Sequence, residues 1–309
     1  MPKLSNFMVW ATISCVFLVV IIGAVLISPT FVDTPSSNGA VGALLQKPFE
    51  NPDDIANSLQ TFAIAMGSAL TFGLVIGGFL RWILKRPVRI AIRIAVAFCV
   101  FLILSVTLVA IFTSITGTLS TGLSSLAFLG ALTLAIIQYF YSEWFVIDTV
   151  VILVAIGITA LLGASLGIIP VIVLLILFSI YDFVAVILSG FMKGLAQGSA
   201  DLRLPSMFIL PYDLGSSYCQ SGINFVAEKR DFMVLGTGDL IFPSILAVSV
   251  WLRLQNIFAV GAVSLGIILA YSLMFVMLKY YPGKFKFLPG LPFLCSGAIL
   301  GLVIFQAIS

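Results

Sequence analysis

Residues 235–243 read Leu-Gly-Thr-Gly-Asp-Leu-Ile-Phe-Pro and lie within a long apolar run from Phe232 to Trp251. Asp239 is the only ionisable residue of that run. A run of this length predicts a helix that spans a bilayer, where a central carboxylate costs about 2.5–3.5 kcal/mol or more. Gly236 and Gly238 add to the cost because glycine weakens a helix. A carboxylate kept in such a place is a candidate functional group.

The composition of the whole chain is that of a membrane protein with several spans. Of its 309 residues, 61% are hydrophobic and 9% are charged, and the mean hydropathy is +1.23. This excludes a water-soluble domain. The net charge of +3 is small, so we expect no nucleic-acid partner.

The absence of histidine limits the chemistry that the chain can perform. Ser-His and Cys-His pairs and a zinc-binding His-Glu-x-x-His helix are all excluded. The four cysteines lie far apart at 15, 99, 219 and 295, and no Cys-x-x-Cys occurs. We therefore expect no metal site and no cofactor, and acid–base chemistry must come from Asp, Glu, Lys, Tyr or Cys.

Nine apolar runs are long enough to cross a bilayer as helices, since about 20 residues are needed. This predicts an all-α polytopic membrane protein, with residues 1–309 forming a single membrane-embedded domain. Its two long connections are 29–59 and 191–231. The predicted spans are 8–28, 60–80, 91–112, 121–141, 146–165, 168–190, 232–251, 257–278 and 288–308.

Lysine and arginine predict the orientation of these spans, because they gather on the cytoplasmic side. If the N-terminus is cytoplasmic, thirteen of the fifteen basic residues lie inside and only Lys47 and Arg253 lie outside. The sequence therefore predicts a multi-pass protein of the cell membrane with an extracytoplasmic C-terminus. In this orientation 29–59 is an extracytoplasmic loop and 191–231 is a cytoplasmic loop.

Three of the twelve acidic residues fall within predicted spans, namely Asp148, Asp182 and Asp239. Asp148 lies near the inner end of its span, where an interfacial role is expected. Asp182 and Asp239 lie on consecutive antiparallel spans, at depths of about 12 and 10.5 Å from the inner face. Neither has a basic residue within its own span.

Two carboxylates that meet inside a membrane cannot both ionise easily, so one keeps its proton. The ionised carboxylate can then act as general base on a water, while the protonated one polarises a peptide carbonyl. This is the chemistry of an aspartic protease. The Asp-Thr/Ser-Gly signature of the water-soluble aspartic proteases is absent.

Three short motifs stand at the ends of the last predicted spans. They are Tyr181-Asp182 in the sixth span, Gly236-Thr237-Gly238-Asp239 in the seventh, and Pro289-Gly290-Leu291-Pro292 at the start of the ninth. In these spans the chain resembles the presenilin and signal peptide peptidase family of intramembrane aspartyl proteases, which carries Tyr-Asp, Gly-x-Gly-Asp and Pro-Ala-Leu there. Gly290 replaces the alanine. The chain resembles the compact, archaeal-type presenilin homologues.

The resemblance implies a presenilin-like fold in which Asp182 and Asp239 hydrolyse peptide bonds within transmembrane helices of other proteins. It implies that the Pro289–Pro292 segment shapes the site and positions the substrate, and that Tyr181 donates a hydrogen bond nearby. Gly236 and Gly238 would let the seventh span approach its neighbours or unwind. The apolar segment 207–211 would form a strand that pairs with unwound substrate. We expect no obligatory partner subunit.

Other uses of the same carboxylates remain open at this point. A proton- or sodium-coupled transporter could carry its ions on Asp182 and Asp239, although such proteins more often have interrupted helices in both halves. A prepilin peptidase also has Gly-x-Gly-Asp, but with a lysine where this chain has Ile241. An inert chaperone of membrane helices would not need both carboxylates.

Overall fold

The structure is a computed structural model that describes residues 5–33, 88–118, 120–188, 191–213, 215–221, 223, 232–280 and 289–309. Within these residues eight helices are long and apolar enough to cross a membrane. Each corresponds to one predicted span, while the predicted second span, 60–80, and most of the predicted 29–59 loop lie outside the described residues. The eight are α1 (Asn6–Ile27), α5 (Val88–Thr116), α6 (Thr121–Phe140), α7 (Trp144–Ser165), α8 (Ile168–Phe183), α11 (Thr237–Leu254), α12 (Ile257–Tyr280) and α13 (Gly290–Ile308).

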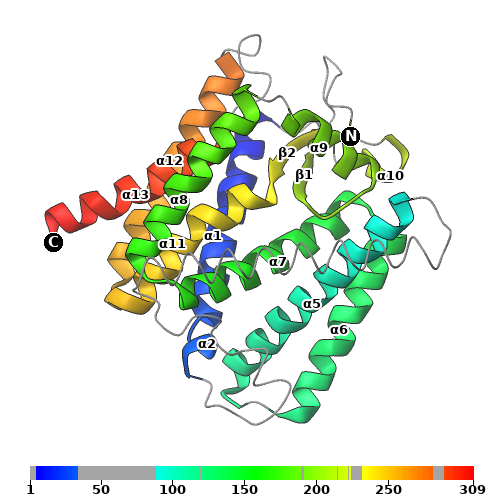
Figure 1. The fold of residues 1–309 in the computed structure, drawn as a ribbon, viewed down its shortest axis with the longest axis horizontal. Helices are drawn as coiled ribbons and strands as arrows, with labels where there is room; N and C mark the ends of the chain where they lie inside the picture. Colours follow the sequence, from blue (N-terminus) through cyan, green and yellow to red (C-terminus); the bar gives the residue numbers. More distant parts are fainter. Residues whose placement is uncertain are drawn as a thin grey trace.

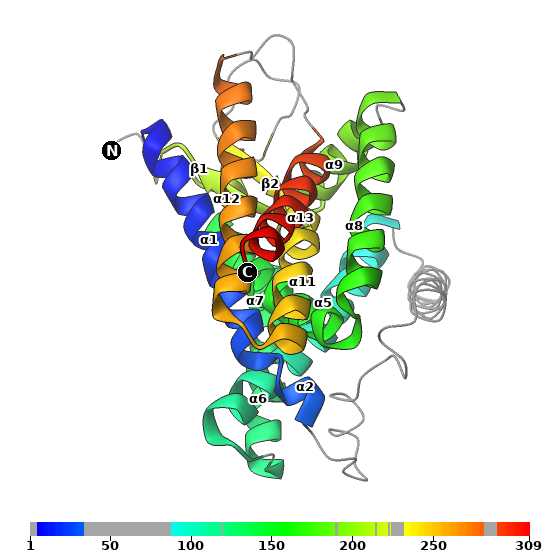
Figure 2. The same ribbon diagram turned by 90° about the vertical axis from the view of Figure 1, so that its left-hand side faces the viewer.

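Besides a π-helical turn that follows α8, five shorter elements complete the described fold. They are α2 (Thr30–Asp33), α9 (Phe191–Asp201), β1 (Met207–Pro211), α10 (Tyr218–Ser221) and β2 (Phe232–Gly236). The described residues of the predicted 191–231 loop thus form two helices and a strand. Figure 2 shows the strands at the same end of the bundle as the N-terminal end of α1.

The two strands add a small antiparallel sheet to the predicted all-α fold. Met207 lies opposite Gly236, and Pro211 lies opposite Phe232. The predicted strand 207–211 is present, but the prediction that the seventh span begins at 232 is wrong, because residues 232–236 form β2. A five-residue apolar run fits a short strand as well as a helix, and here β1 supplies its backbone partners.

Helix α11 begins where β2 ends and runs through the middle of the bundle (Figure 1). It contacts α1, α7, α8, α12 and α13. Its residues from Leu240 to Val250 are buried except for Phe242. A helix that is apolar on every face is expected to be surrounded by others, and α11 fits that pattern.

The sixth predicted span is not one regular helix. The α-helical part, α8, ends at Phe183 and is followed by a π-helical turn, Val184–Leu188. The predicted span, 168–190, therefore includes a π-helical turn that the sequence did not indicate. Single π-helical turns are frequent at functional sites, and this turn begins two residues after Asp182.

Helices α12 and α13 form a closely packed pair. Gly297 allows this approach, because a side-chain carbon built there would lie 2.5 Å from the Ala270 side chain and 2.5 Å from the Gly266 carbonyl oxygen. Small residues commonly bring membrane helices together in this way. The pairing fixes α13, whose first residues reach the candidate site.

Candidate active site

Asp182 lies one residue before the end of α8 and is buried, with 7% of its surface exposed. Its carboxylate oxygen Oδ2 accepts a hydrogen bond from the backbone N–H of Leu291, at 3.3 Å. Leu291 belongs to the first turn of α13, where backbone N–H groups have no partner within the helix. Asp182 therefore satisfies one of these donors from a helix 109 residues away in sequence.

Asp239 lies in the first turn of α11 and is half-buried. Its carboxylate accepts a hydrogen bond from the backbone N–H of Gly236, the residue that precedes the helix. Gly290 packs against the same carboxylate, because a side-chain carbon built at Gly290 would lie 2.9 Å from Oδ2 and 3.0 Å from Oδ1. The Asp239 carboxylate thus fills the space that a side chain at Gly290 would occupy.

The two carboxylates converge on two consecutive residues, Gly290 and Leu291. Asp182 and Asp239 are also close enough for their charges to interact directly. Asp239 lies in the first turn of α11, and Asp182, near the C-terminal end of α8, contacts the first turn of α13; the dipole at each of these two N-terminal turns favours negative charge. The bundle therefore holds two neighbouring carboxylates at a place where one negative charge is stabilised.

An aromatic stack joins the helices that carry the two carboxylates. The rings of Phe178 and Phe242 lie 4.2 Å apart between centroids and are tilted by 30°. Phe178 precedes Asp182 by one turn of α8, and Phe242 follows Asp239 by three residues of α11. This pair was not among the residues predicted for the site, although the helical spacing of each ring from its aspartate is a signal that could have identified it.

The remaining predicted site residues lie at different distances from the carboxylates. Pro289 precedes the first residue of α13, and Pro292 lies in its first turn, so both flank the contact residues Gly290 and Leu291. Gly238 packs against the ring of Phe242. Tyr181 exposes 59% of its surface, and its hydroxyl makes no hydrogen bond among the residues that the structure describes.

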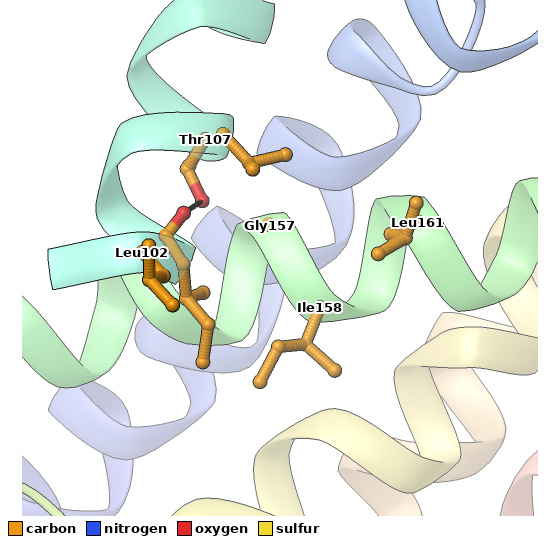
Figure 3. A pocket seen from close by; sticks show the side chains of 7 residues that line it. Leu102, Thr107, Gly157, Ile158 and Leu161 are labelled. Atoms are coloured by element: carbon orange, nitrogen blue, oxygen red, sulfur yellow. Dashed lines mark hydrogen bonds between the residues drawn. The ribbon is translucent and has the colours of Figure 1, made fainter. Parts of the chain in front are cut away.

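An apolar pocket lies elsewhere, between α5 and α7 (Figure 3). It has a volume of about 150 Å³ and is lined by residues including Leu102, Thr107, Gly157 and Leu161. The Thr107 hydroxyl donates to the Ile103 carbonyl within its own helix. The lining offers no ionisable group, so it cannot supply the acid–base chemistry that the aspartates can.

A metal centre is not indicated within the described part of the chain. No group of three or more His, Cys, Asp or Glu residues is placed there so that it could hold an ion. Asp182 and Asp239 instead accept hydrogen bonds from backbone N–H groups, and their two charges interact with each other. This arrangement suits two carboxyl groups that share one proton.

Comparison with known proteins agrees with the chemistry that the two neighbouring carboxylates indicate. A family model described as "Signal-peptide peptidase, presenilin aspartyl protease" matches residues 14–309. The chain belongs to this family of aspartyl proteases. Comparison with curated proteins finds no match.

Two solved structures of a presenilin family intramembrane aspartate protease share the fold. The C222 crystal form has a TM-score of 0.62 and 24% identity, with 99% of this chain and 100% of that chain covered. The P2 crystal form has a TM-score of 0.60 and 25% identity, with 96% of each chain covered. The presenilin-like fold expected from the sequence is therefore confirmed.

Family membership also decides between the activities left open by the sequence. The protein is a multi-pass membrane protein and an intramembrane aspartyl protease, an endopeptidase that acts on transmembrane substrates within the bilayer. None of the comparisons supports the transporter alternative.

Proposed function

We propose that Asp182 and Asp239 are the catalytic pair of this protease. The observation that carries the proposal is their convergence on Gly290 and Leu291, which places both carboxylates at one point of the bundle. The two residues come from helices that are separated in sequence by residues 184–236. Both also stand in the motifs by which the chain resembles its family.

The proposed reaction needs one protonated and one ionised carboxyl group. The ionised group removes a proton from water, and the water oxygen forms a bond to the peptide carbonyl carbon. The protonated group gives its proton to the carbonyl oxygen, which produces a neutral diol. The C–N bond then breaks as the nitrogen takes up a proton from the pair, leaving a new carboxyl and a new amino terminus.

The Pro289–Pro292 segment positions the pair in this proposal. Proline is suited to the first turn of a helix because N–H groups there have no internal partner. The two prolines leave the N–H of Leu291 as the donor that faces Asp182. Gly290 leaves room for the Asp239 carboxylate, and Gly236 donates to it from the end of β2.

An extended substrate segment would bind beside β1 and β2 by adding a strand to the sheet. Main-chain hydrogen bonds along a sheet edge recruit a peptide with little dependence on its side chains. Because β2 continues directly into the turn that carries Asp239, a strand held there would lead toward the carboxylates. Unwinding of the substrate helix is required, since a helical peptide bond is shielded by its own hydrogen bonds.

The basic residues support a cytoplasmic N-terminus in the cell membrane, with 191–231 on the cytoplasmic side and 29–59 on the opposite side. The sheet then lies at the cytoplasmic end of the bundle, from which water reaches the pair. Residues 1–309 act as one membrane-embedded domain without an obligatory partner subunit. Cleavage therefore occurs near the cytoplasmic end of a substrate span.

The test is reconstitution of the purified chain in liposomes with a single-span substrate. Mass spectrometry of the products should place the cut within the apolar segment of the substrate. Asp182→Ala and Asp239→Ala should each abolish that cut while the helical circular dichroism is retained. Cleavage by either variant, or cuts confined to the polar flanks of the substrate, would contradict the proposal.

A further inference from the structure

Asp148 is a buried carboxylate that the proposed reaction does not use. It lies in the second turn of α7 with 7% of its surface exposed. Its oxygen Oδ1 accepts a hydrogen bond of 2.7 Å from the backbone N–H of Ile209, the central residue of β1. A carboxylate on a membrane helix thus holds the middle of a strand that lies against that helix.

The hydrogen-bond pattern of the sheet shows which edge of β1 this contact occupies. The N–H of Thr237 donates to the carbonyl of Ser206, which makes these two residues a hydrogen-bonded pair just beyond the sheet. In an antiparallel pair such positions alternate, so Phe208 and Leu210 face β2 with their backbone groups while Ile209 faces away. Asp148 therefore occupies the outer edge of β1, the edge opposite to β2.

The rest of the outer edge of β1 also offers little to a further strand. Pro211 has no N–H, and all five residues of β1 are buried. In β2, by contrast, Met233, Val234 and Gly236 are half-buried. The backbone groups of Val234 point away from β1 by the same alternation. The accessible edge of the sheet is therefore that of β2.

We propose that Asp148 is a positioning residue for proteolysis that closes the outer edge of β1, so that extended substrate pairs with β2 alone. The proposal rests on the proposed function of the Asp182 and Asp239 pair. Occupation of the Ile209 N–H by Asp148 removes the competing edge and holds the sheet against α7. A substrate strand then has one partner and one register.

The same contact is linked to the catalytic region through the sheet. Asp148 holds Ile209 of β1, and the Ser206 carbonyl, three residues earlier, accepts from Thr237, the first residue of α11. The N–H of Gly236 donates to the Asp239 carboxylate. Loss of the Asp148 acceptor would let β1 move, and the position of a bound strand relative to Asp239 would be less well defined.

The test compares the distribution of cleavage positions in one single-span substrate, read by mass spectrometry of intact products. In Asp148→Ala and Asp148→Leu, which lack the acceptor, the share of cuts at the principal wild-type bond should fall at least about twofold, with new cuts at adjacent bonds. Asp148→Asn keeps an oxygen that can accept from Ile209 and should retain the wild-type distribution. Deuterium exchange over residues 205–212 should be faster in the Ala and Leu variants than in Asp148→Asn.

Leu104→Ala serves as the control for a loss of stability alone. Leu104 is fully buried in a cluster between α5, α6 and α7 that does not include the sheet. This variant should lower Tm but leave the cleavage positions unchanged. Wild-type positions in both Asp148→Ala and Asp148→Leu would overturn the inference, and so would a shift in Asp148→Asn as large as that in Asp148→Ala. Failure of the proposed function would appear separately, as cleavage that persists without Asp182 or Asp239.

Discussion

Gly290 packs directly against the carboxylate of Asp239, so a side chain at this position of α13 requires the carboxylate to shift. A methyl group at this position would lie about 3 Å from three atoms of the carboxylate. The carboxylate is the mobile end of its side chain, so it can shift by a few tenths of an ångström without unfolding the protein. The consequence is expected for catalysis rather than for stability.

We expect Gly290→Ala to retain Tm within a few degrees and to lower kcat roughly tenfold, since a displacement of about 1 Å can cost about 100-fold. Gly290→Val should lower kcat much further because its branched side chain displaces the carboxylate more. Gly261→Ala is the matched control, because a side-chain carbon at Gly261 meets nothing within 4 Å. Full activity in Gly290→Val, measured on the reconstituted substrate, would show that this contact does not set the position of Asp239.

The Phe178 and Phe242 rings are expected to hold α8 and α11 at the separation that the two carboxylates need. Replacing either phenylalanine by leucine keeps an apolar side chain and removes the stack, which contributes about 0.5–1.5 kcal/mol beyond burial. We expect each variant to lower kcat about tenfold with little change in KM. A double-mutant cycle in thermal unfolding measures the coupling between the two rings.

Phe258→Leu provides the comparison for the aromatic stack, since Phe258 lies on α12 and exposes 76% of its surface. It should behave as wild type in both measurements. If the effects of Phe178→Leu and Phe242→Leu on stability and on kcat were additive, the stack would not couple the two helices.

Glu143 links the start of α7 to residues 217–219, which follow β1. Burial acts to raise the pKa of Glu143, but hydrogen bonds from the Ser217 hydroxyl, the Tyr218 N–H and Cys219 together outweigh it and hold the pKa below its usual value. A carboxyl group with a lowered folded-state pKa stabilises the fold above its unfolded pKa of about 4.3, and this stability is lost as the pH falls through the folded pKa.

We therefore expect Glu143→Gln to lower Tm at pH 7 and to have a smaller effect below about pH 4, where the wild-type carboxylate is itself becoming protonated. Thermal unfolding of both proteins between pH 3.5 and 8 measures the difference. A difference in Tm that stays constant over this range would mean that the charge of Glu143 contributes nothing.

Much of this fold could be predicted from the apolar runs, because the length and composition of a run indicate whether it can span a membrane. The candidate pair, Asp182 and Asp239, could also be predicted, because these are two carboxylates on consecutive spans. The start of the seventh span at Thr237 could not, since residues 232–236 become a strand only through pairing with residues 207–211. A short apolar run carries no periodicity that separates the two outcomes.

The contacts that join the site depend on tertiary packing that no local pattern specifies. The N–H of Leu291 reaches Asp182 across 109 residues because α13 packs between α8 and α12. The role of Asp148 was likewise expected to be interfacial, and its partner at Ile209 is set by the way β1 lies on α7. The motif at 289–292 contains the two residues that contact the carboxylates, Gly290 and Leu291, but it does not indicate which atom meets which carboxylate.

The central claim is that Asp182 and Asp239 act as one catalytic unit. The most direct test is to measure kcat/KM for the wild type, the two single variants Asp182→Asn and Asp239→Asn, and the double variant. Because residues that act as a unit are strongly non-additive, each single variant should lose at least about 1,000-fold and the double variant no more than either alone. Retention of more than about a tenth of the activity in either single variant, or a double variant whose loss is the product of the two, would contradict the account.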